Sequence, residues 1–280
     1  MPELPEVETV ARQLRPALVG ATIQRVLVKD QKLSDLLAWE LEGCTFVDVT
    51  RLGKQVVLSV SSGSQAAYVA VHLRMTGRLI WDDGTPLRTV QFQQAALQRP
   101  PIEKHLRAEC VCSSGRLSFF DPRRFGTIQV TADYESLRPV GLDPTTEDFT
   151  ERALVKLLEN AKQPIKQWLL RQDRLVGLGN IYASEILFAS RIHPERLGAA
   201  LVTDEIKQLR LQTKRILARA IRHCGTTFSD FQDSTGSVGG FQRYLKVYNR
   251  EGEPCPRCGA LIERIVQQGR STFLCRGCQQ

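Results

Sequence analysis

Apolar residues recur with a helical period at the start of the chain and then follow a strand-like pattern. An amphipathic helix ended by Gly20 is predicted over residues 2–18 by an apolar stripe of Leu4, Val7, Val10, Leu14 and Leu18. Short runs rich in β-branched and aromatic residues then predict strands at 22–28, 55–60, 66–73, 78–81, 109–112, 116–120 and 127–130. Several short strands at this spacing are typical of a β-sandwich or barrel.

The pattern changes near residue 140. A Pro- and Gly-rich segment at 138–144 predicts a linker, and helical patterns follow at 152–160, 165–170, 180–190 and 205–224. We therefore expect an α+β multidomain protein, in which a β-sandwich with an N-terminal helix precedes a helical domain. A run rich in Ser, Asp and Gly at 228–240 is expected to be mobile, and the polar run at 91–104 predicts a loop.

The distribution of charge adds a candidate partner. The net charge is +8, with 42% hydrophobic and 24% charged residues, which is ordinary for a globular protein. Residues 1–150 have a balance of −1 and residues 151–280 a balance of +9. A basic C-terminal half indicates a polyanionic partner, with a merely solvated basic surface as the alternative. No apolar run reaches the length of a membrane span, and the acidic start is unlike a signal peptide, so we expect a cytoplasmic protein.

Four cysteines near the C-terminus have the spacing of a metal-binding finger. Two CxxC pairs are separated by sixteen residues, and they consist of Cys255, Cys258, Cys275 and Cys278. Four thiolates in this pattern fit one tetrahedral Zn²⁺ in a closed, structural site. Disulfides are the alternative, and they are disfavoured in a chain without an export signal. The other cysteines are expected to be reduced structural thiols: Cys44, Cys110, Cys112 and Cys224.

The first residues carry a candidate nucleophile. After removal of Met1, Pro2 is a secondary amine at the tip of a helix, and Glu3 beside it can donate or accept a proton. Covalent catalysis by an amine needs an unprotonated nitrogen, and an α-amino group titrates near neutrality. The alternative is that Pro and Glu simply start a helix well.

Further motifs are suited to phosphate or DNA contact. Glycines before Asn180 allow a phosphate to approach the N-terminus of a helix. The segment 121–126 pairs Arg123 and Arg124 with Phe125, a combination that can contact a backbone and wedge a base step. An ordinary glycine turn and an ordinary loop with a buried aromatic are the respective alternatives.

Three single residues complete the candidates. Met75 at a strand end is either a second wedge or core filler. Lys54 follows Gly53 at a strand start, where a lysine is usually solvated. Arg270 lies near a turn at 268–269, between strands predicted at 261–266 and 271–274; such a ribbon can lie along phosphates, and a solvated arginine is the alternative.

Four of these motifs, in this order, resemble the bacterial formamidopyrimidine-DNA glycosylase family over essentially the whole chain. They are PELPEVET at 2–9, DPRRFG at 121–126, GNIYASE at 179–185 and the four-cysteine finger with Arg270. The resemblance implies a catalytic β-sandwich domain at 1–134, a linker at 135–150, a helix–two-turn–helix domain with a lesion loop at 151–244 and a β-hairpin zinc finger at 245–280. In this family, DNA lies between the domains.

The resemblance also assigns roles to residues of this chain. Pro2 matches the Schiff-base nucleophile, Glu3 the acid/base that assists opening of the sugar ring, Lys54 the lysine of β-elimination and Arg270 the arginine of δ-elimination. Expected DNA contacts are His105, Arg123, Lys166 and Asn180, and the residues that fill the gap left by an extruded base are Met75, Arg123 and Phe125. The chain departs from the family pattern at Arg74, where a glycine is usual before the wedge methionine.

The expected function is therefore a base-excision repair DNA glycosylase and AP lyase for oxidised purines. Its partner would be double-stranded DNA with oxidised bases or abasic sites; no membrane is expected, and the protein would act as a monomer associated with the nucleoid. An endonuclease VIII-like enzyme for oxidised pyrimidines is one alternative. A non-catalytic DNA-binding protein that uses the finger and the basic half is another.

Overall fold

The computed structural model describes residues 1–63, 65–84, 102–226 and 239–280, which form two compact units. One unit contains residues 1–138 and 223–242, and the other contains residues 139–222 and 243–280. The expected mobility of 228–240 and most of the expected loop at 91–104 lie outside the described residues. Among the described residues, no helix combines the length and apolar character needed to cross a membrane.

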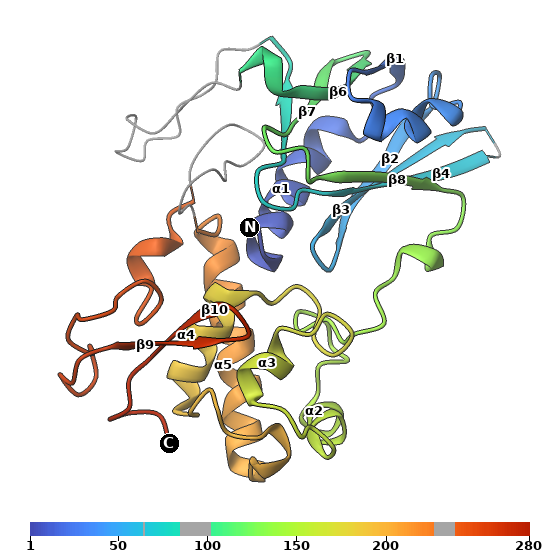
Figure 1. Ribbon diagram of the computed structural model, residues 1–280. Helices are drawn as coiled ribbons and strands as arrows, with labels where there is room; N and C mark the ends of the chain where they lie inside the picture. Colours follow the sequence, from blue (N-terminus) through green and yellow to red (C-terminus); the bar gives the residue numbers. More distant parts are fainter. Residues whose placement is uncertain (64, 85–101, 227–238) are drawn as a thin grey trace. The chain divides into compact units, whose positions relative to one another are not determined.

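The first unit consists of a helix and two four-stranded antiparallel sheets (Figure 1). Helix α1 spans Leu4–Leu18. One sheet has the order β1-β6-β7-β5 and contains Ile23–Val28, Leu106–Cys112, Gly115–Phe120 and Arg78–Asp82. The other has the order β2-β3-β4-β8 and contains Thr45–Leu52, Gln55–Ser62, Gln65–His72 and Thr127–Thr131. Short 3₁₀ segments lie at Gln31–Ala38, Glu103–His105 and Glu135–Leu137.

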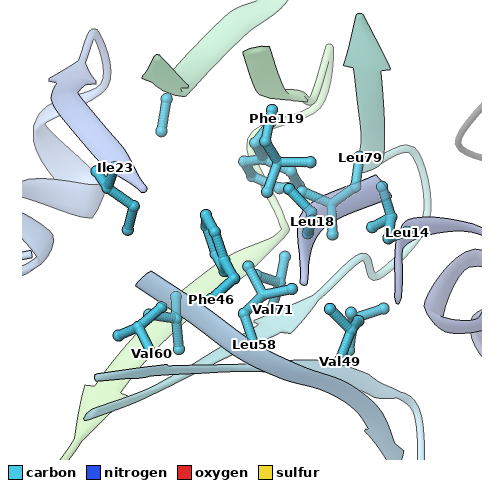
Figure 2. Packing of buried hydrophobic residues seen from close by; sticks show 14 of the residues in the cluster. Leu14, Leu18, Ile23, Phe46, Val49, Leu58, Val60, Val71, Leu79 and Phe119 are labelled. Carbon is cyan, nitrogen blue, oxygen red and sulfur yellow. The ribbon is translucent and has the colours of Figure 1, made fainter. Parts of the chain in front are cut away.

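The two sheets and α1 enclose one apolar core, so the predicted β-sandwich with an N-terminal helix is confirmed. Figure 2 shows side chains of both sheets converging on Leu14 and Leu18 of α1. The labelled core also includes Ile23, Phe46, Val49, Leu58, Val60, Val71, Leu79 and Phe119. Full burial of such a side chain contributes about 1.5–3 kcal/mol, which explains why α1 is fixed against the sheets.

Strand β2 is the main element that the sequence pattern does not predict. A register shift between Phe46 and Asp48 in its pairing with β3 interrupts the alternation of inward and outward residues. Phe46 is buried, whereas the next residue, Val47, is 52% exposed. Because a bulge places two residues opposite one, the apolar residues no longer follow a period of two.

The second unit is helical and ends in a β-hairpin. Its helices are α2 (Glu151–Leu158), α3 (Ile165–Leu169), α4 (Asn180–Ser190) and α5 (Thr203–Arg222), with a 3₁₀ turn at Gly198–Ala200. A further 3₁₀ turn spans Phe241–Tyr244. The hairpin pairs β9 (Glu263–Gln267) with β10 (Arg270–Leu274). Gln268 and Gly269 both have positive φ, as a two-residue hairpin turn with the twist of its strands requires, and this confirms the predicted turn.

Helix α4 lies at the centre of the second unit. It packs against α5 and β10, and nearly all of its residues are buried. The helix begins at Asn180 after Gly179 and ends at Arg191, whose left-handed conformation stops it. The backbone of Asn180 is therefore fixed by packing on several sides.

Arg74 occupies a backbone conformation that favours glycine. Its φ is +53°, in the left-handed region. The backbone N–H of Arg74 donates to Nδ1 of His72 at 3.1 Å, and this bond helps to hold the turn. A side chain in this region costs an L-residue about 1 kcal/mol.

We predict that Arg74→Gly is more stable to urea than Arg74→Ala by about 1 kcal/mol, because both lack the side chain and only glycine relieves the strain. The matched pair is Arg116→Gly and Arg116→Ala, at a strand residue without positive φ, where the order of stability should reverse. Equal stability of the two Arg74 variants would contradict the strain.

Candidate functional site

The N-terminal residues lie at the head of α1. Pro2 is buried, and Met1 before it is 48% exposed. Glu3 is the N-cap of α1 and is only 3% exposed, and it forms a reciprocal capping box with Glu6. A carboxylate at this position is stabilised by the unsatisfied N–H groups and the dipole of the helix. The backbone that directly follows Pro2 is thus held by the hydrogen bonds of the capping box.

Glu6 connects this helix start to a segment far away in the sequence. Its buried carboxylate accepts hydrogen bonds from the Glu3 N–H at 2.8 Å, the Thr226 N–H at 2.7 Å and the Thr226 hydroxyl at 3.1 Å. Gly225 has a φ of +71°, and a Cβ there would lie 2.5 Å from Oε1 of Glu6. The close approach therefore requires glycine at residue 225. Sequence analysis did not single out this role of Glu6, because nothing local indicates a partner at residue 226.

Lys54 lies in the two-residue turn between β2 and β3. Gly53 has a φ of +58°, as the first residue of a tight hairpin turn requires. Arg51 donates to the Gly53 carbonyl at 3.1 Å and to Oε2 of Glu8 at 2.8 Å. Since Glu8 belongs to α1, this ion pair ties the turn that carries Lys54 to the helix that begins behind Pro2. The side chain of Lys54 is 9% exposed.

His72 is a neutral neighbour of this turn. Burial, followed by the charges of Arg74 and Lys54, lowers the pKa of His72 to about 4. Its Nδ1 accepts the Arg74 N–H, so the proton of the neutral ring is on Nε2. His72 can therefore donate a hydrogen bond near neutral pH without carrying charge. Sequence analysis did not single out His72, because the burial that lowers its pKa depends on residues distant in the sequence.

The carboxylate of Asp121 organises the loops that carry the predicted wedge residues. It is 1% exposed and accepts hydrogen bonds from the Thr76 hydroxyl, from the Arg123 N–H at 3.2 Å and from the Gly126 N–H at 2.7 Å. The Asp121 N–H in turn donates to the carbonyl of His105 at 2.9 Å. The side chain of Asp121 therefore joins the segments that contain Met75, Arg123 and Phe125, and its backbone N–H adds the segment of His105.

Two of the predicted wedge side chains are exposed apolar groups. Met75 is 42% exposed and Phe125 is 50% exposed. The guanidinium of Arg123 lies 4.7 Å from the centre of the Phe125 ring, which is a cation–π contact. Apolar and cationic groups presented together can replace stacking and neutralise phosphate. His105 is half-buried at the end of the 3₁₀ segment Glu103–His105.

Arg124, beside this group, has a structural partner. It forms a bidentate ion pair with the buried carboxylate of Asp30, at 2.7 and 2.6 Å. The hydrogen bond from Arg124 lowers the pKa of Asp30 to about 2. Arg124 has a φ of +57°, so this ion pair holds a backbone conformation that is otherwise disfavoured. Of the two adjacent arginines, Arg123 is the one stacked on an aromatic ring.

In the second unit, Lys166 and Asn180 form one buried polar cluster. Lys166 is 1% exposed, and its ammonium donates to Oδ1 of Asn180 at 2.7 Å, to the Ser271 carbonyl at 2.9 Å and to the Thr272 hydroxyl at 2.7 Å. Asn180 also donates to the Ser271 carbonyl, at 2.8 Å. The cluster fixes the start of α4 against the start of β10, directly beside the exposed Arg270.

A second buried charge joins α4 to the chain before the finger. Glu185, 4% exposed, accepts hydrogen bonds at 2.9–3.0 Å from the backbone N–H groups of Lys246, Val247 and Tyr248. Burial raises the pKa of Glu185, and the three N–H donors act in the opposite direction. This contact positions the finger relative to α4.

The four finger cysteines lie together as ligands of one metal ion. Their sulfur atoms all lie within 4.8 Å of one another, and the cluster consists of Cys255, Cys258, Cys275 and Cys278. Sγ atoms of Cys255 and Cys278 are 3.8 Å apart, and those of Cys258 and Cys275 are 3.5 Å apart. Sulfurs bound to zinc at about 2.3 Å in a tetrahedron are separated by about 3.8 Å. Burial and the neighbouring thiols raise the pKa of Cys278 to about 12, so four thiolates need a cation to coexist.

Three family models match consecutive parts of the chain. The formamidopyrimidine-DNA glycosylase N-terminal domain matches residues 1–128, and the formamidopyrimidine-DNA glycosylase H2TH domain matches residues 140–232. A zinc finger found in FPG and IleRS matches residues 252–280.

Individual relatives match over the full length. Formamidopyrimidine-DNA glycosylase of Salmonella dublin is 38% identical over 288 residues, which covers 100% of both chains. The crystal structure of the MutM (Fpg) protein from Thermus thermophilus has a TM-score of 0.84 and 35% identity, and covers 99% of this chain and 98% of that one. Lactococcus lactis Fpg in complex with DNA containing an abasic site has a TM-score of 0.85 and 33% identity, with 99% of each chain covered.

The β-sandwich with its N-terminal helix, the helical unit and the four-cysteine hairpin together define a DNA glycosylase of base-excision repair. The chain belongs to the formamidopyrimidine-DNA glycosylase family. The expected fold is thereby confirmed, and the finger holds a structural metal site.

We predict that Cys258→Ser loses about one zinc per chain and weakens DNA binding, while the first unit remains folded, because the ion stabilises only the finger. Metal content is measured after gel filtration, and folding of the first unit is followed by protease protection. Cys224→Ser, outside the cluster, should keep its metal. Unchanged zinc in Cys258→Ser would contradict the ligand assignment.

Proposed function

We propose that this protein is a bifunctional DNA glycosylase and AP lyase that removes oxidised purines, namely formamidopyrimidines and 8-oxoguanine. A Schiff base at Pro2 carries the reaction, and the strand is cleaved by β,δ-elimination. The observation that supports this most directly is Pro2 at the head of α1, beside the capped carboxylate of Glu3. The turn that carries Lys54 is tied to the same helix through Arg51 and Glu8.

The first steps use Pro2 and Glu3. The Pro2 nitrogen attacks C1′ of the damaged nucleotide as the glycosidic bond breaks, and the base leaves with that electron pair and takes up a proton. Glu3 delivers a proton to the ring oxygen, which opens the sugar. The Pro2 nitrogen gives up the proton that it carried into the attack, which balances the proton taken up by the base, and its lone pair then forms the double bond of a charged iminium as the bond between C1′ and the ring oxygen breaks. Met1 must be removed first, because an amide nitrogen cannot act in this way.

Strand cleavage follows from the same intermediate. The iminium makes the C2′ proton acidic, and its loss expels the 3′ phosphate with the electron pair of the C–O bond. Loss of a second proton, from C4′, expels the 5′ phosphate. Lys54 serves the first elimination and Arg270 the second. Water then hydrolyses the iminium and releases Pro2.

The remaining residues hold an extruded nucleotide and its duplex. An enzyme that acts on a base must take it out of the stack, so Met75, Arg123 and Phe125 fill the gap. His105 and Arg123 bind the DNA, and Lys166 and Asn180 contact phosphates. Since three acceptors already surround the Lys166 ammonium, a phosphate oxygen there would replace one of them or reach Lys166 through Asn180.

Zinc is the metal that suits the finger, because four thiolates and separations of 3.5–3.8 Å between paired sulfurs fit its tetrahedral coordination. It would hold the hairpin that presents Arg270. The protein would act as a monomer on double-stranded DNA with oxidised bases or abasic sites, associated with the nucleoid. We propose domain limits of 1–134, 151–244 and 245–280, with a linker at 135–150 and a lesion loop of which residues 227–238 lie outside the described part of the chain.

The decisive experiment is borohydride trapping on a duplex with an abasic site. We predict a covalent protein–DNA adduct with the mature protein, a partial loss in Pro2→Gly and no adduct when the N-terminus is blocked by an added residue, because the addition turns the Pro2 nitrogen into an amide and moves the free amine away from that position. A protein with the same extension after Gln280 is the control. If the wild type gives no adduct, the chain is a non-catalytic DNA-binding protein; if the blocked protein still reacts, Pro2 is not the nucleophile.

Choice of lesion is tested separately. We predict faster single-turnover excision of 8-oxoguanine opposite cytosine than of thymine glycol, because the Leu4–Thr9 run matches the purine branch of the family. Glu3→Gln should slow the excision of both lesions alike, because Glu3 serves the steps that the two reactions share. This variant therefore reports those shared steps and not the preference for one lesion. Faster release of thymine glycol would assign the protein to the endonuclease VIII-like alternative.

A further inference from the structure

Helix α5 carries a run of positive charge that the proposed reaction does not use. From Ile206 to Arg222 it contains six cationic side chains and no acidic one: Lys207, Arg210, Lys214, Arg215, Arg219 and Arg222. Its acidic residues are confined to the first turn, at Asp204 and Glu205, and Glu205 is already paired with Arg196.

Two of these cations have contacts within the second unit. Arg210 donates to the Phe149 carbonyl at 2.7 Å, and Arg219 lies 4.1 Å from the centre of the Tyr244 ring. Within the described part of the chain, the other four have no acidic partner; they are Lys207, Lys214, Arg215 and Arg222. Lys207, Arg215 and Arg222 are exposed, and Lys214 is half-buried.

These four cations lie along the solvent side of the helix. The opposite side is buried, and α4 packs against α5 there; the buried residues are Ile206, Leu209, Thr213, Leu217 and Ala220. From Lys207 to Arg222 the helix rises by about 22 Å. Duplex DNA carries one charge for about every 1.7 Å of its axis, so a stripe of this length faces about a dozen phosphate charges.

The arrangement is unfavourable for the isolated helix. Like charges stand one turn apart at Arg210 and Lys214 and again at Arg215 and Arg219, and each such pair destabilises a helix by about 0.2–0.5 kcal/mol. The helix dipole favours cations only in the last turn, so it accounts for Arg219 and Arg222 but not for Lys207, Lys214 and Arg215. An external polyanion would remove the repulsion.

We propose that the solvent face of α5 is an accessory binding surface for the phosphate backbone of duplex DNA, separate from the contacts at Asn180 and Arg270. The family acts on DNA, so this polyanion is present whenever the protein works. Charge without base-reading groups binds every sequence alike. The surface therefore retains the enzyme on undamaged DNA. The proposal rests on the proposed function for its partner, although binding to undamaged DNA requires no catalysis.

The test compares two variants that each remove one lysine and one arginine from an exposed position. Lys207→Gln/Arg215→Gln alters the stripe, and Arg25→Gln/Lys32→Gln, in the first unit, is the control. Affinity for undamaged duplexes of about 12 and about 40 base pairs is measured by fluorescence anisotropy against salt concentration. Excision from a short damaged duplex is measured in parallel and should be unchanged in both variants.

We expect the stripe variant to bind the longer duplex about five- to tenfold more weakly than the control, with a salt slope smaller by about two. A loss confined to the longer duplex assigns the stripe to DNA that extends beyond the part held by the primary contact. If the affinity for both lengths falls equally and the number of duplexes bound per chain drops from two to one, the stripe binds a second duplex.

Three results would overturn the proposal. The first is DNA binding by the stripe variant equal to that of the control. The second is an equal loss of affinity for both duplex lengths while each chain still binds one duplex. The third is unchanged DNA binding by the stripe variant together with a loss of its binding to anionic lipid vesicles. Slower excision by the stripe variant would place the helix within the primary contact and would also contradict it. Failure of the proposed chemistry is recognised independently, because wild-type protein would then bind DNA and excise nothing.

Discussion

The carboxylate of Glu6 is buried, and two segments that lie 220 residues apart supply its hydrogen-bond donors. A buried carboxylate without such donors would cost several kcal/mol, so the start of α1 and residues 225–226 are stable only when they meet. The proposed nucleophile, Pro2, lies two residues before Leu4, the first residue of that helix. Its position therefore depends on a contact that closes only when the first unit is fully formed.

The same physical rule recurs in both units. Asp121 gathers the loops of Met75, Arg123 and Phe125, and Lys166 fixes Asn180 to β10. Glu185 holds the chain before the finger through three backbone N–H groups. Each of these buried groups fixes neighbouring segments through several hydrogen bonds at once. Satisfied buried charges of this kind specify one geometry, because any other arrangement leaves a donor or acceptor unpaired.

Much of the fold could be predicted from local patterns. The period of apolar residues located α1, and the glycines before Asn180 located α4 to the residue. Spacing alone identified the four-cysteine cluster, because ligand spacing in a finger is a property of one short segment. Strand β2 was missed because a bulge interrupts its alternation.

Candidate site residues were harder to place. The donors to Glu6, the chain from Glu8 through Arg51 to the turn of Lys54, and the neutrality of His72 depend on residues distant in sequence. No periodicity records such pairings. Composition showed that the second half of the chain is basic. The arrangement of its cations along one side of α5 became clear only from the structure, in which the other side of the helix is buried.

Two main-chain hydrogen bonds join the described residues on either side of residues 227–238. Gly240 donates to the carbonyl of His223 and Phe241 donates to that of Gly225, so the closure does not depend on the side chains between them. A Cβ on Gly239 would lie 2.4 Å from the Gly225 carbonyl oxygen, so the close approach of the two ends requires glycine at residue 239. The sequence between these two ends can therefore vary over evolution without loss of the two bonds, because neither bond uses a side chain.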